Sequence, residues 1–194
     1  MAGEQVGGRR SILNQARMLF LERGYHGVSI RDIVRACGLS NAALYHHFSS
    51  KEDLFAEVVR EYVATVAQRV QEAADGGGTC RTRLAAMATS YARILSESRG
   101  PVQTLLRDLA LPETGGVRNL LPDSTGQGPS LFADVLDEGV ARAEIRPLDT
   151  QRLSILLMGM INSIAVRRMY DAVSRPIEVD VELALDLLFE GIAA

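Results

Sequence analysis

Small side chains and hydrogen-bonding rings share the outer face of a short helix predicted at residues 41–48. Its inner face holds Leu44 and Phe48. Because successive residues of a helix are about 100° apart, the side chains that point outward are those of Ala42, Tyr45 and His46. This face is uncharged, whereas a solvated helix face normally carries Lys, Glu or Arg. It suits a helix that lies in a DNA major groove, so the predicted chemistry is the reading of base edges.

The three histidines raise two alternatives, a metal site and a catalytic site. His46 and His47 are adjacent, and on a helix their side chains point about 100° apart, so they cannot chelate one ion together. The chain contains no Gly-x-Ser-x-Gly, phosphate-binding loop or paired-carboxylate motif to accompany a catalytic histidine. We therefore expect no metal, no cofactor and no enzymatic activity.

A second short helix and a tight turn are predicted just before the outward-facing one. Apolar side chains at i, i+3, i+4 and i+7 give the first helix one buried face, made by Ile30, Ile33, Val34 and Cys37. Ser29 and Asp32 have the spacing of a capping box, which fixes the start of that helix. Gly38 supplies the backbone freedom needed after its end, and Ser40 can cap the next helix. This layout is a helix-turn-helix, with the second helix as the reader.

The rest of the chain also shows helical periodicity and no alternating strand pattern, so the predicted fold is all-α. A flexible leader is expected at residues 1–8. Ser50 and Asp53 have capping-box spacing at the start of a long helix. A loop or lid is expected at residues 112–129, which are rich in Gly and Pro. The remaining helices are predicted at residues 10–23, 51–74, 81–99, 102–110, 130–143, 147–173 and 180–192.

Charge and composition place the chain among globular proteins. Apolar residues make up 47% of it, which is ample for a core. Residues 1–51 carry seven basic against three acidic residues, a net +4, whereas the remainder carries 14 against 21, a net −7. A basic N-terminal quarter is expected if that end meets phosphate. No membrane span or signal peptide is recognisable, so we expect a cytoplasmic protein with no membrane partner.

The N-terminal segment resembles the tetracycline-repressor (TetR) family of bacterial transcription regulators. The resemblance covers about residues 9–69, and the rest of the chain matches only in architecture. It rests on the joint spacing of Ile12-Leu13, Ala16, Leu19-Phe20, Gly24-Tyr25, Ser29-Ile30, Asp32-Ile33, Gly38-Leu39-Ser40, Leu44-Tyr45-His46-His47-Phe48, Ser50-Lys51 and Leu54.

The resemblance implies a homodimeric regulator, most often a repressor, that binds a palindromic DNA operator and is released by a small-molecule inducer. It implies a DNA-binding domain at residues 9–50 and a larger helical domain for ligand binding and dimerisation at residues 51–194. The alternative is a dimeric helix-turn-helix protein that has no small-molecule ligand.

The resemblance also assigns DNA contacts. Backbone, phosphate or base contacts are implied for Ser29, Arg31, Tyr45, His46, His47 and Lys51, and contacts to base edges for Asn41, Ala42 and Ala43. The family often has Lys or Gln and then Gly or Pro where this chain has Asn41-Ala42. Asn can read adenine and Ala can contact a thymine methyl group. Arg9 and Arg10 are either an arm that reaches DNA or two solvated charges.

Two further surfaces are expected in the larger domain. A ligand pocket is expected between the long helix and its neighbours, lined by Tyr62, Met87, Tyr91, Leu106, Arg107, Phe132 and Met158, although Met and aromatic side chains at helical spacing also simply form a core. A dimer interface is expected at Gly159 and Ser163, one turn apart, with Leu183 and Leu187 on the last helix. The two small residues may instead pack within one subunit.

Overall fold

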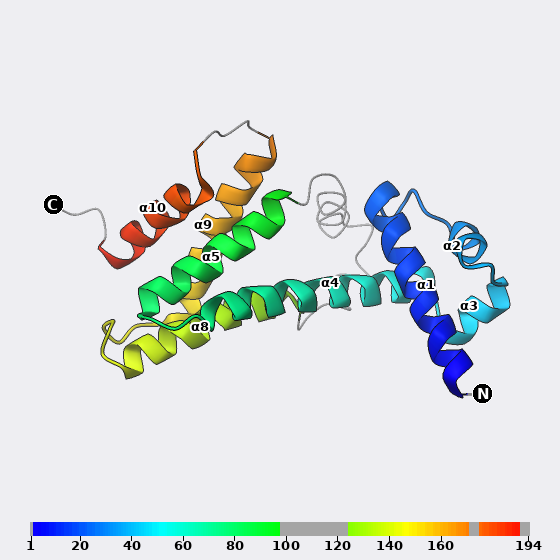
Figure 1. Cartoon of the computed structure of the whole chain (residues 1–194), viewed down its shortest axis with the longest axis horizontal. Coiled ribbons are helices and arrows are strands. Elements are labelled where there is room, and N and C mark those ends of the chain that lie inside the picture. Colours follow the sequence, from blue (N-terminus) through cyan, green and yellow to red (C-terminus); the bar gives the residue numbers. More distant parts are fainter. Residues whose placement is uncertain (1, 98–123, 171–174, 191–194) are drawn as a thin grey trace. The chain divides into compact units, whose positions relative to one another are not determined.

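The computed structural model describes residues 2–97, 124–170 and 175–190 (Figure 1). These residues form helices and connections without a strand, which confirms the predicted all-α fold class. The helices are α1 (Ala2–Arg23), α2 (Ile30–Cys37), α3 (Asn41–His47), α4 (Lys51–Ala74), α5 (Cys80–Glu97), α8 (Ser124–Ala141), α9 (Thr150–Tyr170) and α10 (Ile177–Phe189).

The described residues form two compact units. The first ends at Val63 and the second begins at Ala64, so the division falls inside α4. The domain boundary predicted from the sequence lies between residues 50 and 51, at the start of that helix.

The first unit packs α1, α2, α3 and the first half of α4 around one apolar core. The ring of Phe20 on α1 meets that of Phe55 on α4 nearly edge-on, with 5.1 Å between centroids. Burying a Phe or Leu side chain contributes about 1.5–3 kcal/mol, so this core is the main force that holds α2 and α3 in place. Its buried side chains include Ile12, Leu13, Phe20, Ile33, Val34, Leu44, Phe48, Leu54, Phe55, Val58 and Val59.

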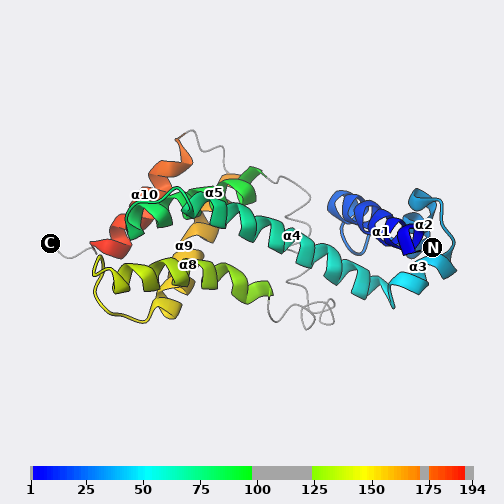
Figure 2. The same ribbon diagram turned by 60° about the horizontal axis from the view of Figure 1, so that its bottom comes forward.

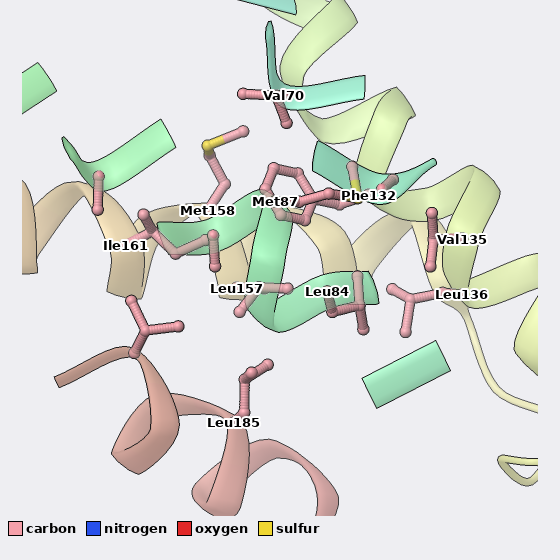
Figure 3. Close-up of a cluster of buried hydrophobic side chains, with 14 of the residues drawn as sticks. Val70, Leu84, Met87, Phe132, Val135, Leu136, Leu157, Met158, Ile161 and Leu185 are labelled. Carbon is pink, nitrogen blue, oxygen red and sulfur yellow. The ribbon is translucent and has the colours of Figure 1, made fainter. Parts of the chain in front are cut away.

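The second unit has a core of its own. Helix α5 packs against α8, α9 and α10, and α9 also packs against α8 and α10. Figure 2 shows the same helices from a second direction. The buried side chains that fill the space between them include Val70, Leu84, Met87, Phe132, Val135, Leu136, Leu157, Met158, Ile161 and Leu185 (Figure 3).

Two helices begin earlier than the sequence predicts. Helix α1 starts at Ala2, so most of the expected flexible leader at residues 1–8 is helical. Extending an existing helix avoids the cost of nucleation, which offsets the weak helix propensity of Gly7 and Gly8. Helix α8 starts at Ser124 and runs through Gly126, Gly128 and Pro129, which the sequence assigns to a loop. Local propensity is a weak guide, and here it gave the wrong boundary.

The other boundaries agree with the prediction to within about three residues. Helix α9 begins at Thr150, and Asp149 just before it accepts a hydrogen bond of 3.0 Å from the backbone N–H of Arg152. The predicted helix at 102–110 and the first part of the predicted loop lie outside the described residues. Within the part of the chain that is described, no helix is long and apolar enough to cross a membrane.

Candidate nucleic-acid interface

Helix α2 is held at both ends by the residues that the sequence predicts. The Ser29 hydroxyl accepts a hydrogen bond from the Asp32 backbone N–H at 3.2 Å, and the Asp32 carboxylate accepts one from the Ser29 N–H at 2.9 Å. The hydrogen bonds from the Ser29 side chain and backbone lower the pKa of Asp32. Gly38 ends the helix in the left-handed region at φ 66°, which glycine adopts without strain. The capping box and the turn are therefore confirmed.

Helix α3 presents the outer face that the sequence predicts. The Ser40 hydroxyl accepts a hydrogen bond of 3.2 Å from the Ala43 N–H, which caps the helix. Its inner side chains, Leu44 and Phe48, are buried. Tyr45 is 51% exposed. The other exposed side chains of this face are Asn41, Ala42 and His46.

Two of the residues expected at the DNA are less accessible than that face. Ala43 is half-buried, as is His47. A Cβ built on Gly8 of α1 would lie 3.4 Å from Nε2 of His47, so this side chain lies against α1. Of the two adjacent histidines, it is His46 that the structure leaves open to a ligand.

The start of α4 places a lysine beside an aromatic ring. The Lys51 ammonium lies 4.0 Å from the centroid of the Tyr25 ring. The Tyr25 hydroxyl donates a hydrogen bond of 2.6 Å to Glu52. Burial, and then the bond to Glu52, raises the pKa of Tyr25, while the same hydrogen bond lowers the pKa of Glu52. These contacts hold Lys51 near the N-terminus of α4, where an anion is favoured.

The cap of α4 differs in one bond from the predicted capping box. The Ser50 hydroxyl accepts from the Asp53 N–H at 3.1 Å, as predicted. The Asp53 carboxylate, however, accepts from the N–H of Ser49 at 3.0 Å rather than from that of Ser50. The carboxylate thus reaches one residue further back, to the end of the turn that follows α3.

Arg9 and Arg10, two neighbouring arginines on α1, have different surroundings. Arg10 is exposed. Ser29 and Arg31, at the start of α2, are also exposed. Arg9 instead pairs with Glu57 at 3.0 Å. Its side chain is 43% exposed.

A family model described as bacterial regulatory proteins, tetR family, matches residues 12–58, which include the whole of α2 and α3. This N-terminal segment belongs to the TetR family. The HTH-type transcriptional repressor KstR2 of Rhodococcus jostii is 25% identical over 188 residues, which are 97% of this chain and 92% of that protein. The HTH-type transcriptional repressor AcnR of Corynebacterium efficiens is 43% identical over 67 residues, 34% of this chain and 36% of that protein.

Solved structures of other regulators share the fold of this chain. The regulator FadR of Bacillus subtilis, solved in complex with stearoyl-CoA, matches with a TM-score of 0.78 and 19% identity. The match covers 95% of this chain and 99% of FadR, and at this identity it shows the fold alone. The TetR relatives carry the names of transcriptional repressors, which are DNA-binding proteins and not enzymes.

The residues expected to line a TetR ligand pocket are distributed over both units. Met87, Phe132 and Met158 lie together in the core of the second unit (Figure 3). At the edge of that core, the Tyr91 hydroxyl and the side-chain oxygen of Asn162 are 3.1 Å apart. Tyr62 packs against the core of the first unit instead. Leu106 and Arg107 lie outside the described residues.

The second unit also has two surface grooves that the sequence did not predict. One, of about 590 Å³, lies among α4, α5 and α10 and has charged walls that include Arg69, Arg93 and Glu178. The other, of about 440 Å³, is lined by apolar residues that include Leu136, Leu153 and Phe189 and by the charged residues Glu144, Arg146 and Glu190. Their lining residues come from segments far apart in the sequence, so no local pattern marks them.

All four residues expected at the TetR dimer interface are exposed on α9 and α10. Leu183 and Leu187 are 56% and 42% exposed, and with Ser163 they line a groove of about 340 Å³. The Ser163 hydroxyl donates to the Gly159 carbonyl at 3.0 Å. These two helices also expose four apolar residues that were not predicted to lie at the interface, Ile155, Leu156, Val166 and Val179. For the three of them on α9, the signal in the sequence is the nearly all-round apolar character of residues 153–166.

A charged cluster fastens α9 to α10 beside this face. The Arg168 guanidinium donates to the Asp180 carboxylate at 2.8 Å and to the Arg175 carbonyl at 2.8 Å. Arg175 forms an ion pair with the other Asp180 oxygen. Burial alone would raise the pKa of Asp180, but the hydrogen bonds from Arg168 and Arg175 outweigh it and lower that pKa.

Proposed function

We propose that this chain is a transcriptional repressor that binds a palindromic operator as a homodimer and leaves it when a small molecule binds to the second unit. The observation that carries the proposal is the outer face of α3. A capped helix of seven residues exposes Asn41, Ala42, Tyr45 and His46 and has no charged residue. Such a face is suited to lie against base pairs in a major groove.

In this proposal each group has a separate role at the DNA. Asn41 donates to and accepts from adenine, and Ala42 contacts a thymine methyl group. Tyr45 and Lys51 contact phosphate, as does Ser29 at the N-terminus of α2, where the helix dipole favours an anion. Base contacts determine which operator is bound, and phosphate contacts set the register on the duplex.

The homodimer is supported by the exposed apolar face of α9 and α10. Its large side chains are those of Ile155, Leu156, Val166, Val179, Leu183 and Leu187. Contiguous apolar surface of this kind usually marks an interface. A second copy of the chain would cover it with the same surface, since two-fold interfaces are self-complementary. The half-sites of the operator are then expected about one helical turn, roughly 34–36 Å, apart or a multiple of it.

The inducer is proposed to enter the second unit at Met87, Phe132 and Met158. Methionine side chains adapt their shape readily, so this core can rearrange around an apolar group. Tyr91 and Asn162 supply polar atoms at its edge. Since α4 belongs to both units, a ligand that favours one position of α4 shifts the population of DNA-binding states. Emptying the operator takes a preference of several kcal/mol for the released state.

Binding to the DNA just upstream of the gene tests the proposal. Fluorescence anisotropy is measured at two salt concentrations, with an unrelated duplex of equal length as control, while sedimentation follows the oligomeric state. The proposal predicts tight, salt-sensitive and sequence-dependent binding by a dimer. Equal affinity for both duplexes, in protein shown by denaturing mass spectrometry to carry no ligand, would refute it.

The ligand-free alternative is tested on the same complex. Candidate inducers are added to the protein–operator complex, beginning with stearoyl-CoA, the ligand in the Bacillus subtilis FadR structure. Release of the operator supports the proposal. The candidates form a broad panel of small molecules. If no compound in this panel releases the operator or raises the melting temperature of the protein, a helix-turn-helix protein without a ligand becomes the better description.

A further inference from the structure

Arg9 connects three elements of the first unit. It lies on α1, and its Nη2 is 3.0 Å from Oε1 of Glu57 on α4. Its guanidinium carbon is also 4.9 Å from the centroid of the Phe48 ring, within the range of a cation–π contact. The other carboxylate oxygen of Glu57 is held at 2.7 Å by Arg60. One arginine therefore joins α1 to α4 and to the residue that ends α3.

Phe48 is the residue through which α3 would be held. It is the C-cap of α3, and its N–H donates to the Leu44 carbonyl at 3.0 Å. Its side chain is buried in the core of the unit. The residue before Arg9 also lies near this end of α3, since a Cβ built on Gly8 would be 3.4 Å from Nε2 of His47. Residues 8 and 9 of α1 thus lie against the C-terminal end of the proposed reader.

We propose that Arg9 is a positioning residue for operator reading. It holds the C-terminal end of α3 against α1 and α4 and does not itself contact DNA. The inference rests on the proposed function, because it concerns the orientation of the helix proposed to read bases. A helix of seven residues has little stability of its own, so its orientation depends on tertiary contacts of this kind.

The charges around Arg9 argue against a contact between its side chain and a DNA phosphate. Its guanidinium faces the Glu57 carboxylate, whereas the next residue, Arg10, is exposed and has no ion pair within the described part of the chain. The Arg9 and Glu57 side chains are 43% and 24% exposed, and pairs with this exposure add little to global stability. Loss of the pair should therefore affect the alignment of α3 more than the folding of the unit.

The experiment compares Arg9→Ala with Arg17→Ala, Arg9→Lys and Glu57→Gln in the full chain. Arg17 is exposed on the same helix, so its removal matches the change in charge without touching Phe48 or Glu57. The duplex is one selected from a random pool by the wild-type protein, and an unrelated duplex is the control. The measurements are affinity for each duplex, the slope of log affinity against log salt concentration, and the melting temperature.

Relative to Arg17→Ala, we expect Arg9→Ala to weaken binding to the selected duplex by about three- to tenfold, the effect of losing one exposed ion pair and one cation–π contact. Affinity for the unrelated duplex and the salt slope should equal those of Arg17→Ala, since phosphate contacts set both. Arg9→Lys should restore most of the affinity. Glu57→Gln should reproduce part of the loss, and adding Arg9→Ala to it should cost less than Arg9→Ala alone.

Two results would overturn this inference and leave the proposed function intact. A salt slope smaller than that of Arg17→Ala by about one per subunit would make Arg9 a phosphate contact. Equal affinity of Arg9→Ala and Arg17→Ala for the selected duplex would leave Arg9 without a role in reading. If the wild-type protein selects no duplex at all, it is the proposed function that fails, and the inference fails with it.

Discussion

At the scale of single residues, the contacts proposed for the DNA-facing surface divide into two classes with different signatures. Asn41 and Ala42 are placed to meet base edges, and Tyr45 and Lys51 to meet phosphate. Phosphate contacts act alike on every sequence and contribute to the salt dependence of binding, whereas base contacts act on one sequence only. Point variants separate these classes without any structure of the complex.

Lys51→Ala should weaken binding to all duplexes and reduce the salt slope by about one per subunit, because one phosphate contact is lost. Tyr45→Phe should also weaken binding to every sequence, without a change in charge. Both are measured by fluorescence anisotropy over a series of salt concentrations, with Arg17→Ala as the charge-matched control. An unchanged slope for Lys51→Ala would remove that residue from the set of DNA contacts.

Asn41→Ala should change base preference instead. A bidentate contact from Asn to adenine is worth about 1–3 kcal/mol of discrimination, so the selected duplex should lose about ten- to a hundredfold in affinity and the unrelated duplex almost nothing. The readout is a repeated selection from a random pool with the variant. Equal loss on both duplexes would show that Asn41 does not read a base.

At the scale of elements, sequence and structure agree best where the information is local. The ends of α2 and the start of α3 are set by Ser29, Asp32, Gly38 and Ser40, each of which acts within three residues of the backbone it satisfies. The pairing of Arg9 with Glu57 could not be predicted this way, because 48 positions separate the two residues. Asp53 shows that short-range predictions also have a limit. Its carboxylate has two candidate N–H donors, those of Ser49 and Ser50, and the sequence does not determine which of them donates.

Elements that lack such local signals were less well predicted. The early start of α8 passes through Gly126 and Pro129, whose propensities point to a loop. Of the expected pocket residues, Met87 and Phe132 share a core, but the spacing that suggested them is the same for a core and for a pocket. The helical pattern identifies buried faces and does not distinguish a filled interior from one that opens to a ligand.

The cluster at Asp180 makes a pH-dependent prediction for the pairing of α9 with α10. Because the folded-state pKa of Asp180 lies below its ordinary value, its contribution to stability is complete above that ordinary value, near 4, and is lost as the pH falls through the lower folded-state value. Asp180→Asn should lower the melting temperature at pH 7, and the difference from wild type should shrink below pH 4. Thermal denaturation at several pH values measures it, and a pH-independent difference would contradict it.

The contact between α8 and α5 makes a prediction about packing. A Cβ on Gly139 would lie 2.7 Å from Sγ and 2.8 Å from Cβ of the buried Cys80 side chain. Gly139→Ala should therefore destabilise the fold by about 1–3 kcal/mol. Urea denaturation compares the variant with the wild type, and equal stability would mean that Cys80 moves aside freely.

At the scale of the whole molecule, the exposed face of α9 and α10 determines the oligomeric state that we propose. Leu183→Glu should convert the dimer into a monomer, because two carboxylates would be buried against apolar surface. Met18→Glu is the control, since Met18 is 64% exposed on α1, which belongs to the other unit. Sedimentation equilibrium measures the mass of each. A dimeric Leu183→Glu variant would place the interface elsewhere.

The same division of the chain sets an order of events during its synthesis. Among the described residues, the core of the first unit is built from side chains up to Val63, whereas the face proposed to pair two copies lies on α9 and α10, much later in the sequence. Domains generally fold as they leave the ribosome, N-terminal first. We therefore expect the proposed DNA reader to fold while the chain is still being made, before two copies can pair. We expect a single copy to bind DNA more weakly than the proposed dimer, because it offers one reader instead of two.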